Sequence, residues 1–156
     1  MSRIITQLAA LLLGLLTGAM LLIGVSLVPY WASLEPLEFS RWFAAHSSFI
    51  GRLMVPLGSL ATVMTLLAAG VAATRDLPGS RWLALAAVSV LFIAAIYPLY
   101  YTDANAALGS GALGAAEITA ELERWRSWHW ARIAAGAVAF LAAIRACSSN
   151  VRMSAA

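Results

Sequence analysis

The sequence predicts an all-α protein, a four-helix transmembrane bundle. Apolar residues make up 62% of its 156 residues and charged residues only 11%, whereas a soluble domain carries about 25% charged residues. Long uncharged apolar runs approach or exceed the roughly 20 helical residues that a bilayer crossing requires. Short polar stretches with proline and glycine separate these runs. The whole chain, residues 1–156, is therefore expected to form a single integral membrane domain.

The first predicted span covers residues 4–28, which contain no charged side chain. A secretory signal peptide is the competing interpretation, but its apolar core takes about 7–15 residues and precedes a site of small residues. This run is longer, and the sequence Val28-Pro29-Tyr30-Trp31 is a poor cleavage site. We therefore interpret the segment as a transmembrane helix.

The second and third predicted spans cover residues 50–73 and 82–101. A short polar connection at residues 33–40 is expected to precede the second helix. The composition of residues 75–81, Arg-Asp-Leu-Pro-Gly-Ser-Arg, predicts the turn between the two spans. Residues 103–116 contain three glycines and predict an irregular loop after the third span.

The fourth predicted span, residues 126–146, differs from the other three. Its uncharged stretch, residues 133–144, is too short to cross a bilayer alone. A complete crossing must therefore carry His129 and Arg132 into the membrane. A charged side chain at the centre of a spanning helix costs about 2.5–3.5 kcal/mol, and such residues generally have a function. The fourth helix is where function is to be sought.

The distribution of arginine predicts that both termini lie in the cytoplasm, because cytoplasmic segments carry an excess of basic residues. The side with the termini holds Arg3, Arg75, Arg81, Arg145 and Arg152. The opposite side holds Arg41, Arg124 and Arg126. Arginine supplies all ten basic residues, a bias typical of GC-rich bacterial genomes, so we expect the cytoplasmic membrane of a bacterium.

The sequence also restricts the partners of the protein. The basic residues do not cluster, so no nucleic-acid partner is predicted. Cys147 is the only cysteine, which excludes an intramolecular disulfide and a cysteine-based metal site. The expected partners are the lipid bilayer and a small hydrophobic molecule, and the sequence gives no indication of the oligomeric state.

Polar side chains at membrane depth line up on the fourth helix. Glu121, Trp125, His129, Arg132 and Gly136 follow one another at spacings of four, four, three and four residues. Residues at these spacings share one face of an α-helix. A pocket on this face would be lined by aromatic and basic groups.

A second group of polar residues lies on the second helix. His46 follows Trp42 by four residues, and Arg52 lies next to the same face. At about 1.5 Å per residue, these groups, the fourth-helix pair and Asn105 come to one layer near the outer leaflet. Arginines that reach the headgroups on their long side chains and histidines in helix–helix hydrogen bonds are the competing interpretations.

Two kinds of chemistry could use these groups. In one, His46 and His129 are the axial ligands of a b-type haem, and the arginines pair with its propionates. The two histidines differ in height by about 8 Å on a straight helix, which counts against level axial ligands. With only two histidines, no other metal site is predicted.

The other chemistry needs no cofactor, and we prefer it. His129 would act as a general base, while Arg132 and Arg52 would hold the resulting oxyanion. Asn105 and Trp125, with His46, would bind an aromatic substrate in the apolar pocket.

Two segments of the sequence resemble a known family. Asn105-Ala-Ala-Leu108, followed by Leu122-x-x-Trp125-x-x-Trp128-His129-x-x-Arg132, is similar to the C-terminal signature of the anthrone-oxygenase-like family. The proline-bearing Val55-Pro56-Leu57 segment and the four-span layout are similar as well. Most of that family is a bacterial domain of unknown function.

The resemblance implies an oxygenase-like or redox function. The fungal members oxidise anthrones to anthraquinones with molecular oxygen and without an established cofactor. A non-catalytic haem-binding or electron-transfer module and a structural membrane subunit are the alternatives that the residues leave open.

Overall fold

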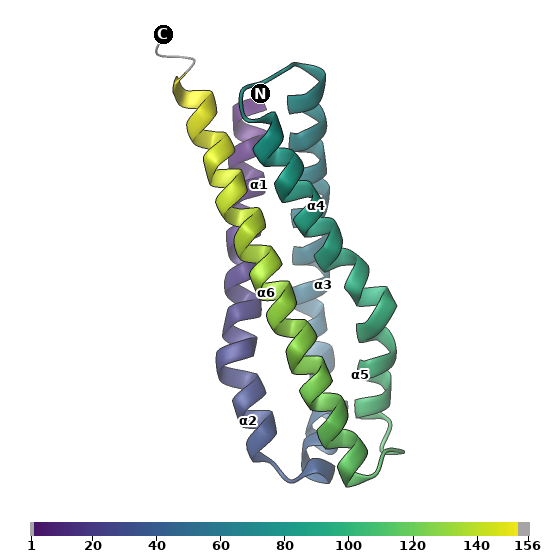
Figure 1. The fold of residues 1–156 in the computed structure, drawn as a ribbon. Coiled ribbons are helices and arrows are strands. Elements are labelled where there is room, and N and C mark those ends of the chain that lie inside the picture. The colour runs from purple at the N-terminus through teal and green to yellow at the C-terminus, as the bar shows by residue number, and fades with distance from the viewer. Residues whose placement is uncertain (1, 153–156) are drawn as a thin grey trace.

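The computed structural model describes residues 2–152 as four antiparallel helical columns in one bundle (Figure 1). The first column comprises α1 (Ser2–Leu22), the π-helical turn η1 (Ile23–Leu27) and α2 (Val28–Ser33). The second is α3 (Pro36–Thr74), and the fourth is α6 (Ala115–Arg152). The third comprises α4 (Ser80–Ile96), the π-helical turn η2 (Tyr97–Tyr101) and α5 (Thr102–Gly109). The predicted fold class, an all-α bundle of four helices, is confirmed.

Each column is long and apolar enough to cross a membrane. The candidate spans are Arg3–Ser33, Pro36–Thr74, Ser80–Gly109 and Ala115–Ser149. The predicted spans fall inside these segments but are shorter. At 39 residues, α3 is about 58 Å long, roughly twice the thickness of the hydrocarbon core. The columns therefore continue beyond the apolar layer.

The predicted loop at residues 103–116 is wrong over its first half. Residues 102–109 form α5, and non-helical backbone is confined to residues 110–114. Packing against α3 explains the difference, because the buried Ser40 hydroxyl donates to the Leu108 carbonyl at 2.7 Å and Leu108 is fully buried. Tertiary contacts outweigh the low helix propensity of the glycines here.

The predicted polar connection at residues 33–40 is also shorter than expected. Only Leu34 and Glu35 are non-helical, and α3 begins directly at Pro36. Proline suits the first turn of a helix because its missing N–H would have no helical partner there. Ser40 is therefore part of a buried helix face rather than of a loop.

The start of α1 and the end of α6 lie at the same end of the bundle, together with the turn at residues 75–79 (Figure 1). The α2–α3 connection and the loop at residues 110–114 lie at the opposite end. This arrangement follows from four antiparallel columns joined by short connections.

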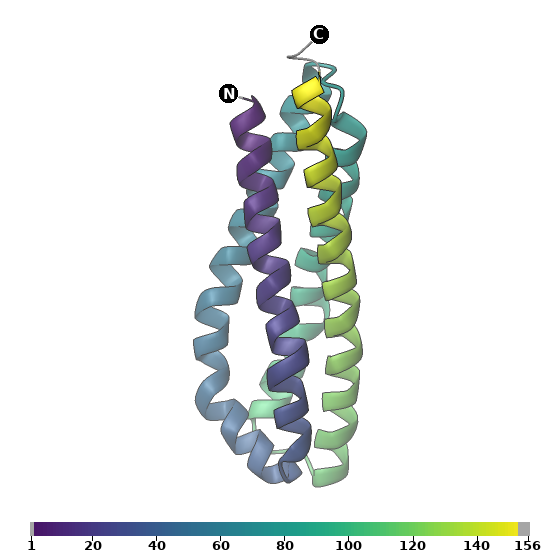
Figure 2. The ribbon, with the colours of Figure 1, turned by 90° about the vertical axis from the view of Figure 1, so that its left-hand side faces the viewer.

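The second column is packed more loosely than the others. Of its most apolar 18-residue window, 17% is buried, against 33–39% in the other three columns. Pro56 lies inside α3, where its ring and missing N–H favour a bend. Figure 2 shows α3 bowed away from the rest of the bundle over its middle part. Space is left on the inner side of the bow.

Both π-helical turns interrupt otherwise regular columns. Proline lies close to each: Pro29 follows η1, and Pro98 lies inside η2. A proline supplies no N–H to the preceding turn, which favours a local change of hydrogen-bond register. Such single π-turns occur frequently at functional sites, and residues of both turns line the cavity described below.

Candidate functional site

His129 is a buried base on α6, with 2% of its surface exposed. Its Nε2–H donates a hydrogen bond to the Met20 carbonyl of α1 at 2.9 Å. A carbonyl oxygen can only accept, so the proton of the neutral ring lies on Nε2. The other ring nitrogen, Nδ1, carries the lone pair and has no hydrogen-bond partner among the residues that the structure describes. The side chain is thus held in the tautomer that leaves Nδ1 free to accept a proton.

The first column packs closely against α6 at Gly24 in η1. A Cβ added at Gly24 would lie 2.9 Å from Ile133 Cδ1 and 3.5 Å from His129 Cδ2. The added carbon would be in ordinary contact with the imidazole, but it would overlap Ile133 Cδ1, which would have to move aside. The carbonyl that accepts from His129 belongs to Met20, three residues before the π-turn begins at Ile23. A carbonyl oxygen has two lone pairs, so the Met20 carbonyl can accept from a side chain of α6.

Trp125 stacks on His129, with ring centroids 4.7 Å apart and planes inclined by 20°. Its Nε1–H donates to Asn105 Oδ1 of α5 at 2.9 Å. The Tyr101 hydroxyl donates to the Trp125 backbone carbonyl at 3.3 Å. Trp31 meets the indole edge-on, at 5.4 Å between centroids. These contacts fix the indole, and the indole in turn fixes one face of the imidazole.

Arg132 lies one helical turn from His129 and stacks over Tyr101, with Cζ 4.5 Å from the ring centroid. Within residues 2–152, its Nε has no hydrogen-bond partner, and no carboxylate lies within ion-pair distance. A cation at membrane depth usually has an anionic partner. Arg132 is therefore available to an anionic group that the described chain does not supply.

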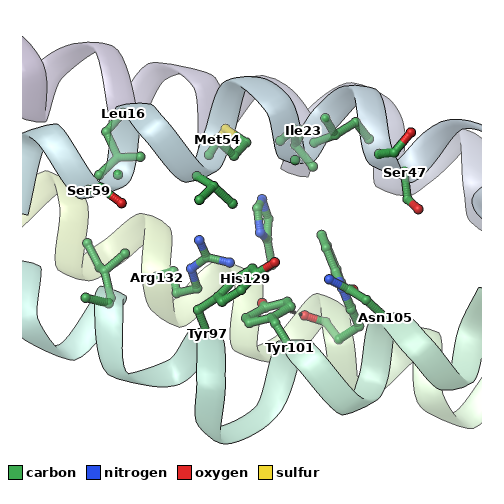
Figure 3. Close-up of a pocket in the computed structure, with 18 of the residues that line it drawn as sticks. Leu16, Ile23, Ser47, Met54, Ser59, Tyr97, Tyr101, Asn105, His129 and Arg132 are labelled. Atoms are coloured by element: carbon green, nitrogen blue, oxygen red, sulfur yellow. Dashed lines mark hydrogen bonds between the residues drawn. The ribbon is translucent and has the colours of Figure 1, made fainter.

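These side chains line one cavity of about 620 Å³ that is enclosed by residues of all four columns. Its size lies within the range of small-molecule sites. Figure 3 shows His129 and Arg132 side by side, both directed toward the side of the cavity formed by the first column and α3, with Tyr101 and Asn105 beside them. On α3, small residues alternate with larger apolar ones along the cavity. The small residues are Ser47, Ser48, Gly51, Gly58, Ser59 and Thr62, and the larger ones are Phe43, Ile50, Met54, Val55 and Val63.

Three buried side-chain atoms of the described residues lack a hydrogen-bond partner: Trp31 Nε1, His129 Nδ1 and Arg132 Nε. All three belong to side chains that line the cavity. An unpaired buried polar atom costs about 1–3 kcal/mol, and unsatisfied groups of this kind need a specific explanation. Two donors and one acceptor, each with less than 1 Å² of exposed surface, are thus unpaired on side chains around one cavity. A ligand with an O–H and acceptor oxygens would satisfy them once it displaced the atoms that cover them.

The structure brings four of the predicted site residues to this cavity, namely His129, Arg132, Asn105 and Trp125. His46 and Arg52 do not line it. The exposed His46 stacks on Trp42 at 4.8 Å and shares a hydrogen bond with the Trp42 carbonyl. The exposed Arg52 guanidinium lies over Phe49. Their predicted role in substrate binding finds no support in this geometry.

The face of α3 explains why these two residues point elsewhere. The cavity side carries Ser47, Gly51, Met54 and Gly58 at spacings of four, three and four. His46 precedes Ser47 by one residue, which turns its side chain by about 100° around the helix. The helix face predicted from Trp42 and His46 therefore points away from the cavity. The face that lines the cavity carries small residues such as Ser47, Gly51 and Gly58.

Sequence reasoning also missed Trp31 and Tyr101 as cavity residues. Tryptophan and tyrosine are common at membrane–water interfaces, so neither residue type by itself indicates a cavity. Pro98 was the available signal for η2, because a proline within an apolar helix marks a break in the hydrogen-bond ladder. Nothing comparable in the sequence singles out Trp31.

The residues present do not fit a haem with two histidine ligands. His46 is exposed outside the cavity, and Nε2 of His129 is engaged by Met20. Among the described residues, no group of three or more His, Cys, Asp or Glu could hold a metal ion. The two histidines therefore do not form one axial pair in this arrangement.

Comparisons with models of protein families, with curated proteins and with solved structures return no match for this chain. The resemblance to the anthrone-oxygenase-like family stays a prediction, and the interpretation of the site depends on its geometry.

Proposed function

We propose that the protein is a multi-pass enzyme of the bacterial cytoplasmic membrane, with both termini in the cytoplasm, that oxidises a hydrophobic aromatic molecule. The observation that carries the proposal is the set of three unpaired polar atoms, on Trp31, His129 and Arg132, in side chains lining one cavity. The apolar lining of the cavity suits a flat, hydrophobic substrate. The unpaired atoms could form hydrogen bonds with the edge of the substrate that carries its oxygen atoms.

The proposed first step is a proton transfer. His129 Nδ1 takes a proton from a phenolic O–H, or from a C–H next to a ring carbonyl, as a general base. The negative charge that develops on the substrate oxygen is stabilised by the Arg132 cation, with the Trp31 N–H as a second donor. Both interactions are stronger in an apolar cavity than in water.

The oxidation itself is proposed from the resemblance to anthrone oxygenases. The electron-rich anion is oxidised by molecular oxygen, so that a ring CH₂ and O₂ become a ring C=O and H₂O. In this scheme the substrate supplies the electrons, O₂ accepts them, and the chain supplies the base and the oxyanion partner. The fit of a cofactor-free site to Trp31, His129 and Arg132 supports this choice over haem.

The experiment uses two matched pairs of substitutions in protein reconstituted into nanodiscs, with oxygen uptake measured on an anthrone. His129→Gln should lower the turnover number about 100- to 10,000-fold, because the general base is lost. Arg132→Gln should lower it about 100- to 1,000-fold through loss of oxyanion stabilisation. The residues outside the cavity provide the controls, and His46→Gln and Arg52→Gln should leave uptake unchanged.

If the control substitutions outside the cavity lowered the turnover number as much as the substitutions at His129 and Arg132, the assignment of the active site to this cavity would be wrong. No uptake by the wild-type protein across a panel of hydroxylated aromatic substrates would overturn the enzymatic proposal and favour a structural subunit.

A further inference from the structure

The cavity extends well beyond the polar groups that the proposed reaction uses. Its lining on α3 runs from Phe43 to Val63, about 30 Å along the helix axis. On α6 it runs only from Trp125 to Arg132, about 10 Å. The cavity is therefore elongated along α3, with His129 and Arg132 gathered in one part of it.

The remaining part, which we call the apolar arm, is lined by Leu16, Gly58, Ser59, Thr62, Val63, Ile93 and Ala94, and the hydroxyls of Ser59 and Thr62 are the polar side-chain groups among these residues. It contains no charged residue. The Thr62 hydroxyl donates to the Gly58 carbonyl at 2.8 Å within α3, so its hydrogen-bonding capacity is used inside the helix. A chain of hydrocarbon suits this wall better than a polar group does.

The cavity opens sideways, between α3 and the third column. Exposed lining residues occur on both sides of this seam: Val55 and Val63 of α3, at 47% and 53%, and Tyr97 of η2, at 43%. All three lie within segments that are long and apolar enough to span a membrane. The loosely packed α3 forms one side of the opening. A ligand dissolved in the bilayer can therefore reach the cavity without passing through water.

From these observations we infer the class of ligand, in an inference that rests on the proposed function. It is a membrane-dissolved amphiphile with an aromatic head bearing hydroxyl and carbonyl or phenolic oxygens, and with one unbranched apolar chain. The head lies against His129 and Arg132, and the chain lies in the apolar arm.

The chain contributes orientation more than affinity, because lipid tails are as apolar as the side chains that replace them. A measurement of where the chain lies is therefore sharper than a comparison of dissociation constants. The probe is a hydroquinone carrying a decyl chain that ends in a diazirine, photolysed in nanodiscs and mapped by mass spectrometry. The labels should concentrate on residues 55–63 and 93–97.

Two matched glycine substitutions test the path of the chain. A Cβ at Gly58 would meet only Leu16 Cδ1, at 3.9 Å, so Gly58→Leu should fold while filling the arm. It should reduce labelling of the arm at least tenfold. Gly70 has nothing within 4 Å of an added Cβ and does not line the cavity, so Gly70→Leu on the same helix should have no effect.

A second matched pair tests the position of the head. Arg132→Gln should lower labelling, whereas Arg52→Gln should not. Labels spread evenly over the lipid-facing surface, or arm labelling that persists in Gly58→Leu or Arg132→Gln, would overturn the inference.

Photolabelling requires no turnover of the probe. The proposed catalytic function and the inferred ligand class can therefore be disproved independently of each other. Labelling confined to the arm without oxygen uptake would support the ligand class and overturn the catalytic proposal. Normal uptake with an anthrone that lacks a chain, together with scattered labels, would overturn the ligand class alone.

Discussion

His129 is held from two sides, and both contacts leave the same nitrogen free. The Met20 carbonyl accepts from Nε2, and Trp125 covers one face of the ring. Trp125 is itself tied to Asn105. A base that is oriented through neighbours in this way depends on residues that never touch the substrate's reacting atoms.

The Asn105–Trp125 hydrogen bond can be tested by a double-mutant cycle. Asn105→Ala should lower the free energy of unfolding by about 1–3 kcal/mol, because it leaves the part-buried indole N–H unpaired. In a Trp125→Phe background the same change should cost much less, since no N–H remains to satisfy. Thermal unfolding in detergent measures both values, and equal costs in the two backgrounds would show that the bond is unimportant.

Gly24 gives a second test at this scale. Gly24→Ala should destabilise the protein by about 1 kcal/mol, the low end of overpacking costs, because its methyl group would lie 2.9 Å from Ile133 Cδ1, the end of a side chain that can move aside. Ile133→Val removes that atom, so the double variant should recover much of the loss in unfolding midpoint. Gly18 has nothing within 4 Å, and Gly18→Ala should be neutral or slightly stabilising. A similar loss at both glycines would contradict the packing argument.

Among the elements, the number and order of the helical columns could be predicted from hydropathy, because a bilayer demands long apolar segments. The fourth-helix face could be predicted as well, since Trp125, His129 and Arg132 are spaced as one helix face. The inner face of α3 could not, because its small residues carry no chemical signal of their own. Helix α5 was missed because contacts distant in sequence, such as Ser40 with Leu108, stabilise it.

Pro56 is the element-scale feature that most directly shapes the cavity. Pro56→Ala restores a backbone N–H and should straighten α3, which stabilises the helix by up to about 3 kcal/mol. The straighter helix should close part of the space inside the bow, and turnover should fall although the unfolding midpoint rises. Oxygen uptake and thermal unfolding check the two opposed effects. A rise in both would show that the bow is not needed for function.

At the scale of the whole molecule, the antiparallel columns bring both ends of the described chain to one side. Arg3, Arg75, Arg81 and Arg145 belong to this side, where basic residues favour the cytoplasm. The site lies nearer the opposite end, so its substrate is expected in the outer half of the bilayer.

Reporter fusions test this orientation. Alkaline phosphatase fused after the C-terminus should be inactive, because it stays in the cytoplasm, whereas a fluorescent protein at the same point should mature. Phosphatase inserted into the loop at residues 110–114 should be active. The reverse pattern at the two positions would contradict the predicted orientation and place the cavity in the inner leaflet.

Under the proposed function, the sideways opening between α3 and η2 has a consequence for kinetics. For a substrate that arrives through this opening, the relevant concentration is the number of substrate molecules per lipid molecule rather than the molar concentration in water. Extra lipid added at constant total substrate would dilute it in two dimensions and slow the reaction, although the aqueous volume is unchanged. The meaningful Michaelis constant of such an enzyme is a mole fraction in the membrane.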